Sequence, residues 1–287
     1  MGLRLGWFST GRDEAARNML QTVYDDLKAI DAPATIEWIF CHREVGDGPE
    51  NDESRERRLF FRLADELGIQ MKTLSHVRFK PELRKKGLAE SASAAEASAD
   101  LERWRDLFGE EVVKVVDQDP VDVVVMAGYM LIIGDPELRR LNLVNIHHAL
   151  PWGPRGTWQE VIHQLIAEEA HEQGIMVHLV TKTLDRGPVI SYCRFPIRGE
   201  GWEDLWEQWR RDIGSNTPRE ERERHPLFRK IREKGEVREL PLLSRAIQEL
   251  AFGHIRIKDR TIWANGKLQD QGVDLTDHIE ECVRQSG

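Results

Sequence analysis

The sequence predicts an α/β protein: an open, mostly parallel sheet flanked by helices, followed by C-terminal helices and a hairpin. Two observations predict this class. Up to residue 197, short apolar runs alternate with amphipathic helical patterns, which is typical of strand–helix–strand units that build a parallel sheet. Hydrophobic residues make up 40% of the 287 residues and charged residues 32%, so a sizeable core can form beneath a well-solvated surface.

The N-terminal part supplies the first expected strands. "LRLGWFST" opens the sheet, because its apolar run ends in Ser-Thr-Gly before a helical pattern. The expected elements are strands at 3–10, 34–43 and 69–75, with helices at 11–30 and from the polar loop at 47 to near Gly68. Residues 78–118 then form a long helical or irregular excursion. Within it, the Ala- and Ser-rich stretch at 89–100 suits an exposed helix, since Ala favours that conformation.

The central part contains the strand with the clearest burial signal. "VDVVVMAGYM" (121–130) is a run of Val and Met that ends at Ala127-Gly128, a small pair that lets backbone or ligand approach closely. Further strands are expected at 143–149, 175–181 and 188–197, with a helix at 157–170 between the first two.

Residues 202–250 look helical. The segment 210–234 carries nine Lys or Arg against five Asp or Glu, and predicts either a solvated helix face or a lid that contacts an anion. Residues 253–268 alternate apolar and polar types and contain Asn265-Gly266, which predicts a hairpin with a second turn at its end.

Composition argues against several classes of function. A net charge of −9 is unlike that of a general binder of nucleic acid or of anionic membranes. No N-terminal stretch resembles a signal peptide, and no run approaches the roughly 20 apolar residues needed to span a bilayer. The three cysteines, Cys41, Cys193 and Cys282, are too widely spaced for a metal motif or a disulfide framework. We therefore expect a cytoplasmic protein with reduced thiols, without nucleic-acid or membrane partners.

Three places carry residue types suited to chemistry. "NLVNIHHALPWGPRG" ends a predicted strand in Asn145 and His147, which point to the same side of an extended chain. They are either structural polar residues with satisfied hydrogen bonds or residues that stabilise charge during a reaction. "HLVTKTLDRGPVI" places His178 on a strand and Asp185 after it, where a turn residue is the plainer interpretation. The loop after the first strand precedes a helix, where open sheets bind ligands and helix N-termini hold phosphates.

Together these motifs follow a known order. Ala-Gly-Tyr-Met at a strand end, then Asn-x-His, a proline-rich loop, Gly-x-x-Val-His-x-Val and Asp-x-Gly-Pro-Val-Ile strongly resemble the folate-dependent formyltransferase family, most closely its glycinamide ribonucleotide branch. The resemblance runs from about residue 3 to 197 and resumes weakly over 236–268. It implies a Rossmann-like catalytic domain at 1–200, with a helical extension and hairpin at 201–287 packed on the same domain. It also implies transfer of a formyl group from 10-formyltetrahydrofolate to a small-molecule primary amine, first of all glycinamide ribonucleotide in purine synthesis.

The resemblance assigns roles to individual residues. The catalytic group falls on Asn145, His147 and Asp185, with His178 in support. The residues expected to enclose the pterin are Tyr129, Met130, Leu131, Ile132, Ile133, Val180, Thr181 and Leu184. The residues expected to bind the amine substrate are Thr10, Gly11, Arg12 and Glu239. No metal is implied, and the sequence shows no clustered set of His, Cys and carboxylate ligands.

Elementary chemistry supports the transfer independently. A formyl group that moves from N10 of a folate to an amine passes through a tetrahedral intermediate with an oxyanion. Asn145 can donate an amide hydrogen bond to that oxygen and a protonated His147 a charged one, and losing one such donor typically costs about 100- to 1,000-fold in rate. Asp185 beside His147 would favour the imidazolium, and can hold a water that carries the proton from the amine to N10.

The sequence departs from the family pattern on the acceptor side. The loop from Ser9 to Glu14 keeps one glycine of the family's Gly-x-Gly-Ser-Asn turn and adds two acids where a phosphate is expected. His148 replaces a proline, and Trp158 stands near a family His. Insertions at 78–110 and 205–235 are absent from the compact purine enzymes.

Several functions therefore stay open. The acceptor could instead be another amine, such as an amino sugar nucleotide or an amino acid derivative. Methionyl-tRNA is disfavoured, because that branch adds a basic domain and residues 201–287 hold sixteen Lys or Arg against seventeen Asp or Glu. Hydrolysis of formyltetrahydrofolate is disfavoured, because deformylases carry an N-terminal regulatory domain and the catalytic pattern here begins by residue 3. A non-catalytic folate-binding homologue would not need the complete Asn, His and Asp set. The oligomeric state is open, with a homodimer as one option.

Overall fold

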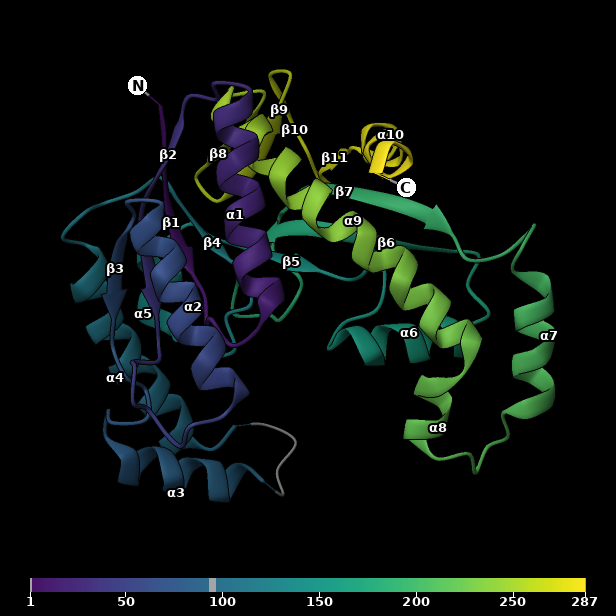
Figure 1. Ribbon diagram of the computed structural model, residues 1–287, viewed down its shortest axis with the longest axis horizontal. Coiled ribbons are helices and arrows are strands. Elements are labelled where there is room, and N and C mark those ends of the chain that lie inside the picture. Colours follow the sequence, from purple (N-terminus) through teal and green to yellow (C-terminus); the bar gives the residue numbers. More distant parts are fainter. Residues whose placement is uncertain (1, 93–96, 287) are drawn as a thin grey trace. The chain divides into compact units, whose positions relative to one another are not determined.

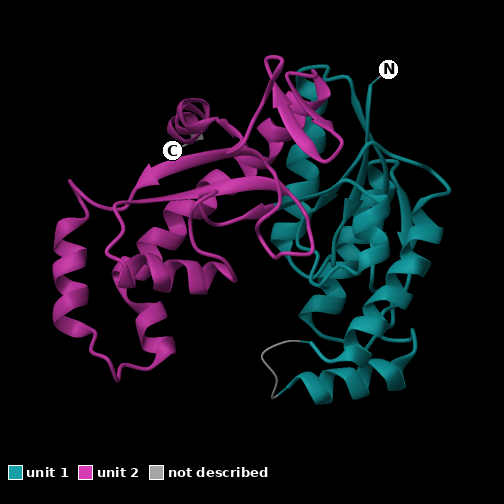
Figure 2. Cartoon of the chain, turned by 180° about the vertical axis from the view of Figure 1, so that it is seen from behind, with its two compact units in different colours: residues 1–145 teal, residues 146–287 magenta. Residues whose placement is uncertain are grey.

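The computed structural model describes residues 2–92 and 97–286. The chain divides into two compact units, residues 1–145 (unit 1) and 146–287 (unit 2), shown in teal and magenta in Figure 2. Each unit has its own strands, helices and apolar core. The expected boundary near residue 200, between a catalytic domain and a C-terminal extension, stays a prediction.

Unit 1 alternates strands and helices, as its hydrophobic pattern predicts. Its strands are β1 (Leu3–Phe8), β2 (Ala34–Cys41), β3 (Gln70–Thr73), β4 (Val123–Met126) and most of β5 (Leu143–His147). Its helices are α1 (Glu14–Ala29), α2 (Asp52–Glu66), α3 (Pro81–Ser91), α4 (Ala99–Val116) and α5 (Asp135–Arg140). The side chains of Asp13, Asn51 and Ser98 accept backbone N–H groups in the first turns of α1, α2 and α4, which explains where these helices begin.

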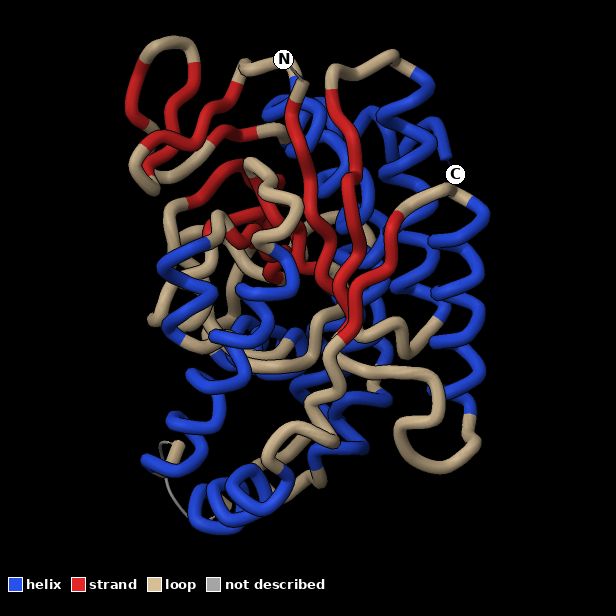
Figure 3. Tube along the Cα trace, turned by 90° about the vertical axis from the view of Figure 1, so that its left-hand side faces the viewer, coloured by secondary structure: helices blue, strands red, loops and turns tan. Residues whose placement is uncertain are grey.

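The strands of unit 1 form a parallel sheet in the order β5-β4-β1-β2-β3. Helices α1 and α2 pack against each other, and α4 packs against α3 and α5 (Figure 1). Figure 3 shows the same strands in red and the helices in blue. Because β1 and β4 are parallel neighbours, with Phe8 opposite Met126, the loops that follow them lie at the same edge of the sheet. That edge is where open sheets of this class bind ligands.

The core of unit 1 is rich in aromatic side chains. Trp7, Phe8, Trp38 and Phe40 are fully buried. Gly6 allows this packing, because a Cβ at that position would lie 2.3 Å from the ring of Trp38. The aromatic core therefore holds β1 and β2 in place beneath the loop that begins at residue 9.

Unit 2 begins within β5. Its further strands are β6 (Glu172–Leu179), β7 (Val189–Pro196), β8 (Ile255–Lys258), β9 (Thr261–Ala264), β10 (Lys267–Leu268) and β11 (Val273–Asp274). Its helices are α6 (Trp158–Ala167), α7 (Glu203–Asp212), α8 (Arg219–Arg224), α9 (Pro226–Ala251) and α10 (Thr276–Ser286).

The long helix α9 organises unit 2. It packs against β6 and β7, which are antiparallel, and against α10 (Figure 1). Strand β11 lies beside β7 in parallel. Strands β8, β9 and β10 form a separate antiparallel sheet. Its two-residue turns, Asp259-Arg260 and Asn265-Gly266, have φ of 48° and 58° and of 52° and 73°, the left-handed backbone that tight hairpins require.

The predicted α/β class, with a mostly parallel sheet and flanking helices, is confirmed. The hairpin over 253–268 forms with its second turn, as expected. Residues 78–118 contain α3 and α4, so the helix expected at 89–100 is helical only at its two ends; residues 93–96 lie outside the described residues. The sequence pattern missed α5, β11 and α10. The six-residue α5 and the two-residue β11 are too short to show a period.

Candidate active site

The two residues predicted on β5 lie at the carboxyl end of the strand. Asn145 pairs with Met126 of β4 and is partly exposed. His147 is the last residue of β5 and is buried, with 4% of its surface exposed. Because side chains alternate along a strand, Asn145 and His147 share one side of β5.

The imidazole of His147 has an oxygen acceptor at each ring nitrogen. Nε2 lies 3.1 Å from the carbonyl oxygen of Pro154, and Nδ1 lies 3.5 Å from Oδ2 of Asp185. A neutral imidazole carries one N–H and can donate to only one of these oxygens. Only the doubly protonated ring donates to both, and this is the form that stabilises an oxyanion best.

Asp185 reaches His147 from the loop that follows β6. The residue is 8% exposed and has φ of +52°, a left-handed conformation that Asp tolerates better than most residues. Its Oδ2 also accepts a hydrogen bond of 3.4 Å from the backbone N–H of Gly156, and its Oδ1 lies 3.8 Å from Nε2 of His178. The carboxylate therefore stands between two histidines.

His178 is the more deeply buried of the two, with 1% of its surface exposed. Burial lowers the pKa of His178 below its usual value, so the ring is neutral. Its Nδ1 lies 2.9 Å from the carbonyl oxygen of Leu179 and must be the protonated nitrogen, because a carbonyl oxygen only accepts. Nε2 then faces Asp185 as an acceptor, without a hydrogen-bond partner of its own. His178 thus lies beside Asp185 but donates no hydrogen bond to its carboxylate.

Arg186 and Gly187 determine the conformation of the loop that carries Asp185. The guanidinium of Arg186 donates to the carbonyl oxygens of Pro151 and Gly153 at 3.1 and 3.2 Å, which ties this loop to the proline-rich loop after β5. A Cβ on Gly187 would lie 1.6 Å from the carbonyl oxygen of Leu179. Only glycine therefore allows the chain to turn back onto β6 at this point.

A cavity of about 200 Å³ lies beside Asp185 in unit 2. The residues that line it are Pro151, Trp152, Met176, Asp185, Arg186, Gly187, Val189, Asp270 and Gln271. Asp270 and Gln271 come from the segment between β10 and β11. Neither residue could be predicted from the sequence, because no local pattern links that segment to the loop after β6.

In unit 1, Thr10 lies in a buried hydrogen-bond network. Its Oγ1 accepts the backbone N–H of Met130 at 3.0 Å and lies 2.7 Å from Nε2 of His42. Nδ1 of His42 in turn lies 2.9 Å from Nδ1 of His76. Burial lowers the pKa of His42 to about 2 and that of His76 to about 4, so both rings are neutral. The network joins the loop after β1 to the loop after β4, and its two histidines were not among the predicted site residues.

The remaining residues of the first loop are engaged locally. Gly11 has φ of +58°, and a Cβ there would lie 2.9 Å from the ring of Phe60. Arg12 pairs with Asp13 at 3.3 Å on the surface. Asp13 accepts the N–H of Ala16 and caps α1, so this acid is explained by helix initiation.

The residues expected to enclose the pterin divide between the two units. In unit 1, the ring of Tyr129 packs against Phe8 and His42 with centroids 5.1 and 4.8 Å apart, so its side chain belongs to the core. The remaining unit 1 residues of this group are the exposed Met130 and Ile132 and the half-buried Leu131 and Ile133. Those in unit 2 are the exposed Leu184 and the half-buried Val180 and Thr181. Large apolar side chains left exposed on loops are what a flat aromatic ligand would cover.

Glu239 lies on the inner side of α9 and is buried. Its Oε1 is 3.1 Å from Nδ1 of His148 and 2.7 Å from Nη1 of Arg232. Burial raises the pKa of Glu239 to about 7, although Arg232 opposes this effect. Arg232 belongs to the basic segment 210–234 and was not among the predicted site residues.

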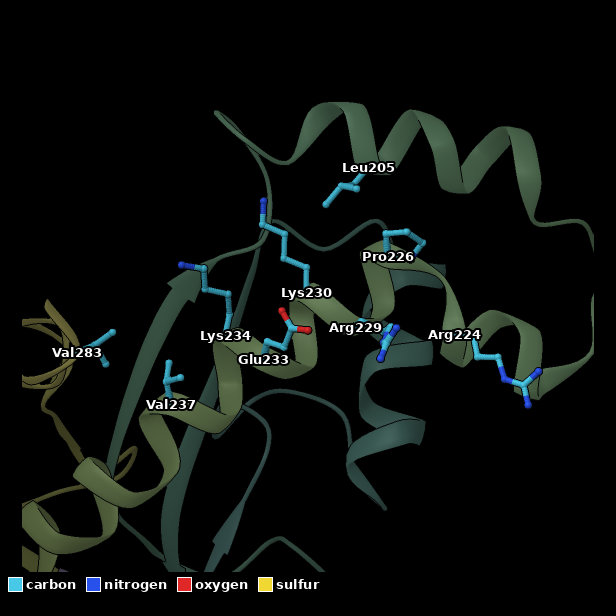
Figure 4. Close-up of a pocket in the computed structure, with 9 residues that line it drawn as sticks. All are labelled: Leu205, Arg224, Pro226, Arg229, Lys230, Glu233, Lys234, Val237 and Val283. Carbon is cyan, nitrogen blue, oxygen red and sulfur yellow. The ribbon is translucent and has the colours of Figure 1, made fainter. Parts of the chain in front are cut away.

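The outer face of α9 carries a larger cavity, of about 720 Å³. Its lining residues are Leu205, Arg224, Pro226, Arg229, Lys230, Glu233, Lys234, Val237 and Val283 (Figure 4). Lys230 and Lys234 project from the same side of the helix, with Glu233 between them (Figure 4). Within the basic segment 210–234, Arg232 therefore turns inward to Glu239, whereas Arg224, Arg229, Lys230 and Lys234 line this outer cavity.

Residues 2–92 and 97–286 contain no group of three or more His, Cys, Asp or Glu side chains that could hold a metal ion. The expectation that the reaction uses no metal stays a prediction. None of the helices in the same part of the chain is both long and apolar enough to cross a membrane.

Known proteins resemble this chain in sequence and in structure. The family model described as formyl transferase matches residues 65–211. The phosphoribosylglycinamide formyltransferase of Escherichia coli (strain K12) is 28% identical over 171 residues, which cover 58% of this chain and 68% of that protein. The enzyme of the same name from Saccharomyces cerevisiae is 30% identical over 133 residues, or 43% of this chain and 59% of that protein.

Among solved structures, the phosphoribosylglycinamide formyltransferase of Coxiella burnetii in complex with CHES superimposes with a TM-score of 0.58 and 16% identity. The superposition covers 96% of this chain and 99% of that chain. At this identity the likeness concerns the fold, which extends over almost the full length of both chains.

Proposed function

This chain belongs to the formyl transferase family, and on that premise we propose that it moves a formyl group from 10-formyltetrahydrofolate to the primary amine of glycinamide ribonucleotide. Formyl transfer is the chemistry of the family. The donor and the acceptor are the parts that we propose, from the names of the similar enzymes and from the residues of the site.

The contact between His147 and Asp185 carries this proposal. Nδ1 of His147 faces Asp185, which leaves Nε2–H as one hydrogen-bond donor for a developing oxyanion. The amide of Asn145, on the same side of the strand, is the second donor. With Nδ1 donating to Asp185, the substrate oxyanion would have to replace the Pro154 carbonyl oxygen as the acceptor of Nε2–H.

The proposed reaction begins when the neutral acceptor amine attacks the formyl carbon. The carbonyl oxygen becomes an oxyanion, which Asn145 and the imidazolium of His147 stabilise with hydrogen bonds. Collapse of this tetrahedral intermediate breaks the bond between the formyl carbon and N10. The amine loses one proton and N10 gains one, through a water held by Asp185, so the products are the formamide and tetrahydrofolate.

We assign the donor to the loops after β4 and β6. The backbone at Tyr129, with Met130, Leu131, Ile132 and Ile133 and with Val180, Thr181 and Leu184, would enclose the pterin. The exposed Met130 and Leu184 supply apolar surface, and Thr10 fixes the backbone of Met130 through its hydroxyl. On the acceptor side we assign the phosphate to Thr10, Gly11 and Arg12, and the amine to Glu239.

A second candidate is transfer to a different amine, such as an amino sugar nucleotide or an amino acid derivative. One observation favours it: the two charged side chains at 12–13 already have partners within the protein, since Arg12 pairs with Asp13 and Asp13 caps α1. A phosphate at this loop would have to displace Asp13 from Arg12. The acceptor-side residues therefore fit glycinamide ribonucleotide less closely than the catalytic group fits formyl transfer.

Absorbance-monitored formation of tetrahydrofolate from the 10-formyl donor tests both candidates. Glycinamide ribonucleotide, an amino sugar nucleotide and an amino acid derivative are supplied in turn, with formate release measured when no acceptor is present. Turnover that requires glycinamide ribonucleotide supports the first candidate, and turnover only with another amine supports the second. Formate release at the same rate with and without amines would mean hydrolysis and would contradict both.

The cytoplasmic location, the homodimer and the absence of nucleic-acid or membrane partners stay predictions. A small-molecule acceptor agrees with the substrates named for the similar enzymes.

A further inference from the structure

Two donor groups converge on one oxygen of Glu239. Nη1 of Arg232 lies 2.7 Å and Nδ1 of His148 lies 3.1 Å from Oε1. The side chains of Glu239, His148 and Arg232 are 10%, 18% and 20% exposed, so these contacts are largely shielded from water. A shielded hydrogen bond to a carboxylate is stronger than an exposed one.

The protons of this cluster can be assigned from its chemistry. Arg232 is always charged and only donates. Burial lowers the pKa of His148 to about 3, so His148 is neutral. Nδ1 of His148 lies 3.1 Å from Oε1 of Glu239 and 3.4 Å from Nη1 of Arg232, so it either donates to the carboxylate or accepts from the guanidinium; in both tautomers Arg232 is the one full positive charge that faces Glu239.

No other charged group replaces Arg232 in this role among the contacts of the described residues. On α9 itself, Glu236 is a like charge that raises the pKa of Glu239 further. From β6, the neutral Gln173 reaches the backbone oxygen of His148 at 3.4 Å. From α10, Glu280 is engaged by Arg238 at 2.6 Å.

Arg232 is itself held in place on two sides. Its guanidinium lies 4.5 Å from the ring centroid of Trp158 on α6, a favourable contact of a cation with an aromatic face. Its Nε pairs with Glu236 at 2.8 Å, one helical turn further along α9. The orientation of Arg232 is therefore fixed without Glu239.

The cluster also touches the catalytic strand, because His148 directly follows His147. Neither Arg232 nor Glu239 lies within the segment that the family model matches, which ends at residue 211. Arg232 comes from the insertion at 205–235, to which the sequence pattern alone assigns no definite role.

We propose that Arg232 is a positioning residue for the acceptor: together with His148 it holds Glu239 as an oriented carboxylate, ready to receive the amine. The proposal rests on the proposed function for the identity of the acceptor. It gives the insertion a role in substrate recognition. Without the guanidinium, the pKa of the buried Glu239 would rise above its value of about 7, so the side chain would be mostly protonated at neutral pH and would lose its attraction for an amine or ammonium group.

The first test compares Arg232→Gln with wild type in the acceptor KM between pH 6 and 9. We expect the KM of Arg232→Gln at pH 7 to rise about fivefold, which corresponds to a rise of roughly one unit in the pKa of Glu239 from its value of about 7, and to recover as the pH rises. kcat at saturating acceptor and the KM for the folate donor should stay close to wild type. Arg232→Lys, which keeps the charge, should restore most of the affinity.

Glu236→Gln is the matched control, since it removes the other partner of Arg232 and lies half exposed on the same helix. Because Glu236 is a like charge for Glu239 and Trp158 still holds the guanidinium of Arg232, the loss of Glu236 should leave the acceptor KM unchanged or lower at pH 7. If Glu236→Gln and Arg232→Gln raised KM equally, general damage to α9 would explain both, and the proposal would be wrong.

The second test needs no substrate. Carbon-13 NMR of the Glu239 side-chain carboxyl, assigned by its loss in Glu239→Gln, reports its titration directly. The midpoint should move upward in Arg232→Gln and not in Glu236→Gln; an unchanged midpoint in Arg232→Gln overturns the proposal. If the midpoint moves but wild type does not use glycinamide ribonucleotide, the proposed acceptor fails while the role of Arg232 in holding Glu239 stands.

Discussion

Asp185 lies 3.5 Å from Nδ1 of His147, and it makes this contact from a backbone with φ of +52°. The carboxylate reaches the histidine across the fold of unit 2, from the loop after β6 to the end of β5. The contact orients the ring and gives Nδ1 an acceptor, as the proposed catalytic role of His147 requires.

The first prediction concerns the residues that would contact the oxyanion. Asn145→Ala or His147→Ala should each lower kcat by about 100- to 1,000-fold, since each removes one donor to the oxyanion. Folate binding, measured by equilibrium titration of the donor, should change little in either variant. Near wild-type turnover in either one would show that the catalytic group is assigned wrongly.

The second prediction concerns Asp185. Asp185→Asn keeps the shape of the side chain but removes the negative charge beside Nδ1 of His147, so kcat should fall by about 100-fold or more. The KM values should change much less, because the residue acts on the transition state. Steady-state kinetics with saturating donor separates these effects. A variant that altered only KM would place Asp185 in binding.

The third prediction concerns the glycine that shapes the Asp185 loop. Gly187→Ala places a Cβ against the carbonyl oxygen of Leu179, so the loop must shift. We expect a loss of about 1–3 kcal/mol in the free energy of unfolding and a fall in kcat. Gly214→Ala is the matched control, because a Cβ there meets nothing within 4 Å. Equal thermal stability of the two variants would contradict this account of the loop.

The fourth prediction concerns Thr10. Thr10→Val keeps the shape but removes the hydroxyl that accepts the backbone N–H of Met130 and contacts Nε2 of the buried His42, and an unpaired buried polar group costs about 1–3 kcal/mol. Part of this cost should appear as a rise of roughly tenfold in the KM for the folate donor. Thr10→Ser keeps the hydroxyl and should behave like wild type. If Ser and Val were equally impaired, the methyl group and not the hydroxyl would matter.

The fifth prediction follows from the buried His42, whose pKa is lowered to about 2. In the unfolded chain, His42 has its usual pKa of 6.5 and binds a proton as the pH falls below that value. In the folded chain, His42 stays neutral over the same pH range. The free energy of unfolding should therefore fall with pH below about 6.5, by up to about 1.4 kcal/mol per pH unit from this group.

Urea unfolding at pH 7.5 and pH 5 measures this slope. His42→Gln should make it shallower, while His254→Asn, at an exposed position, should leave it unchanged. An equal slope in wild type and His42→Gln would show that His42 is not the group responsible.

The sequence by itself determined the features that depend on local backbone physics. The buried run of Val and Met in β4, the alternation in β8 and β9, and the turn at Asn265-Gly266 follow from side-chain period and from the backbone freedom of glycine. Asn145 and His147 share a side of β5 because side chains alternate along any strand. These features need no knowledge of the rest of the chain.

Only the tertiary structure decided which distant side chains meet. The contact of Asp185 with His147 depends on the left-handed backbone at Asp185, and the burial of the Tyr129 ring depends on β1 lying beside β4. In the sequence, nothing distinguishes Arg232 from the other cations of segment 210–234. In the structure, α9 packs against β6, and Arg232 faces inward and pairs with Glu239. Its role could not be foreseen, because burial and charge pairing are set by which elements pack together, and periodicity within one element does not contain that information.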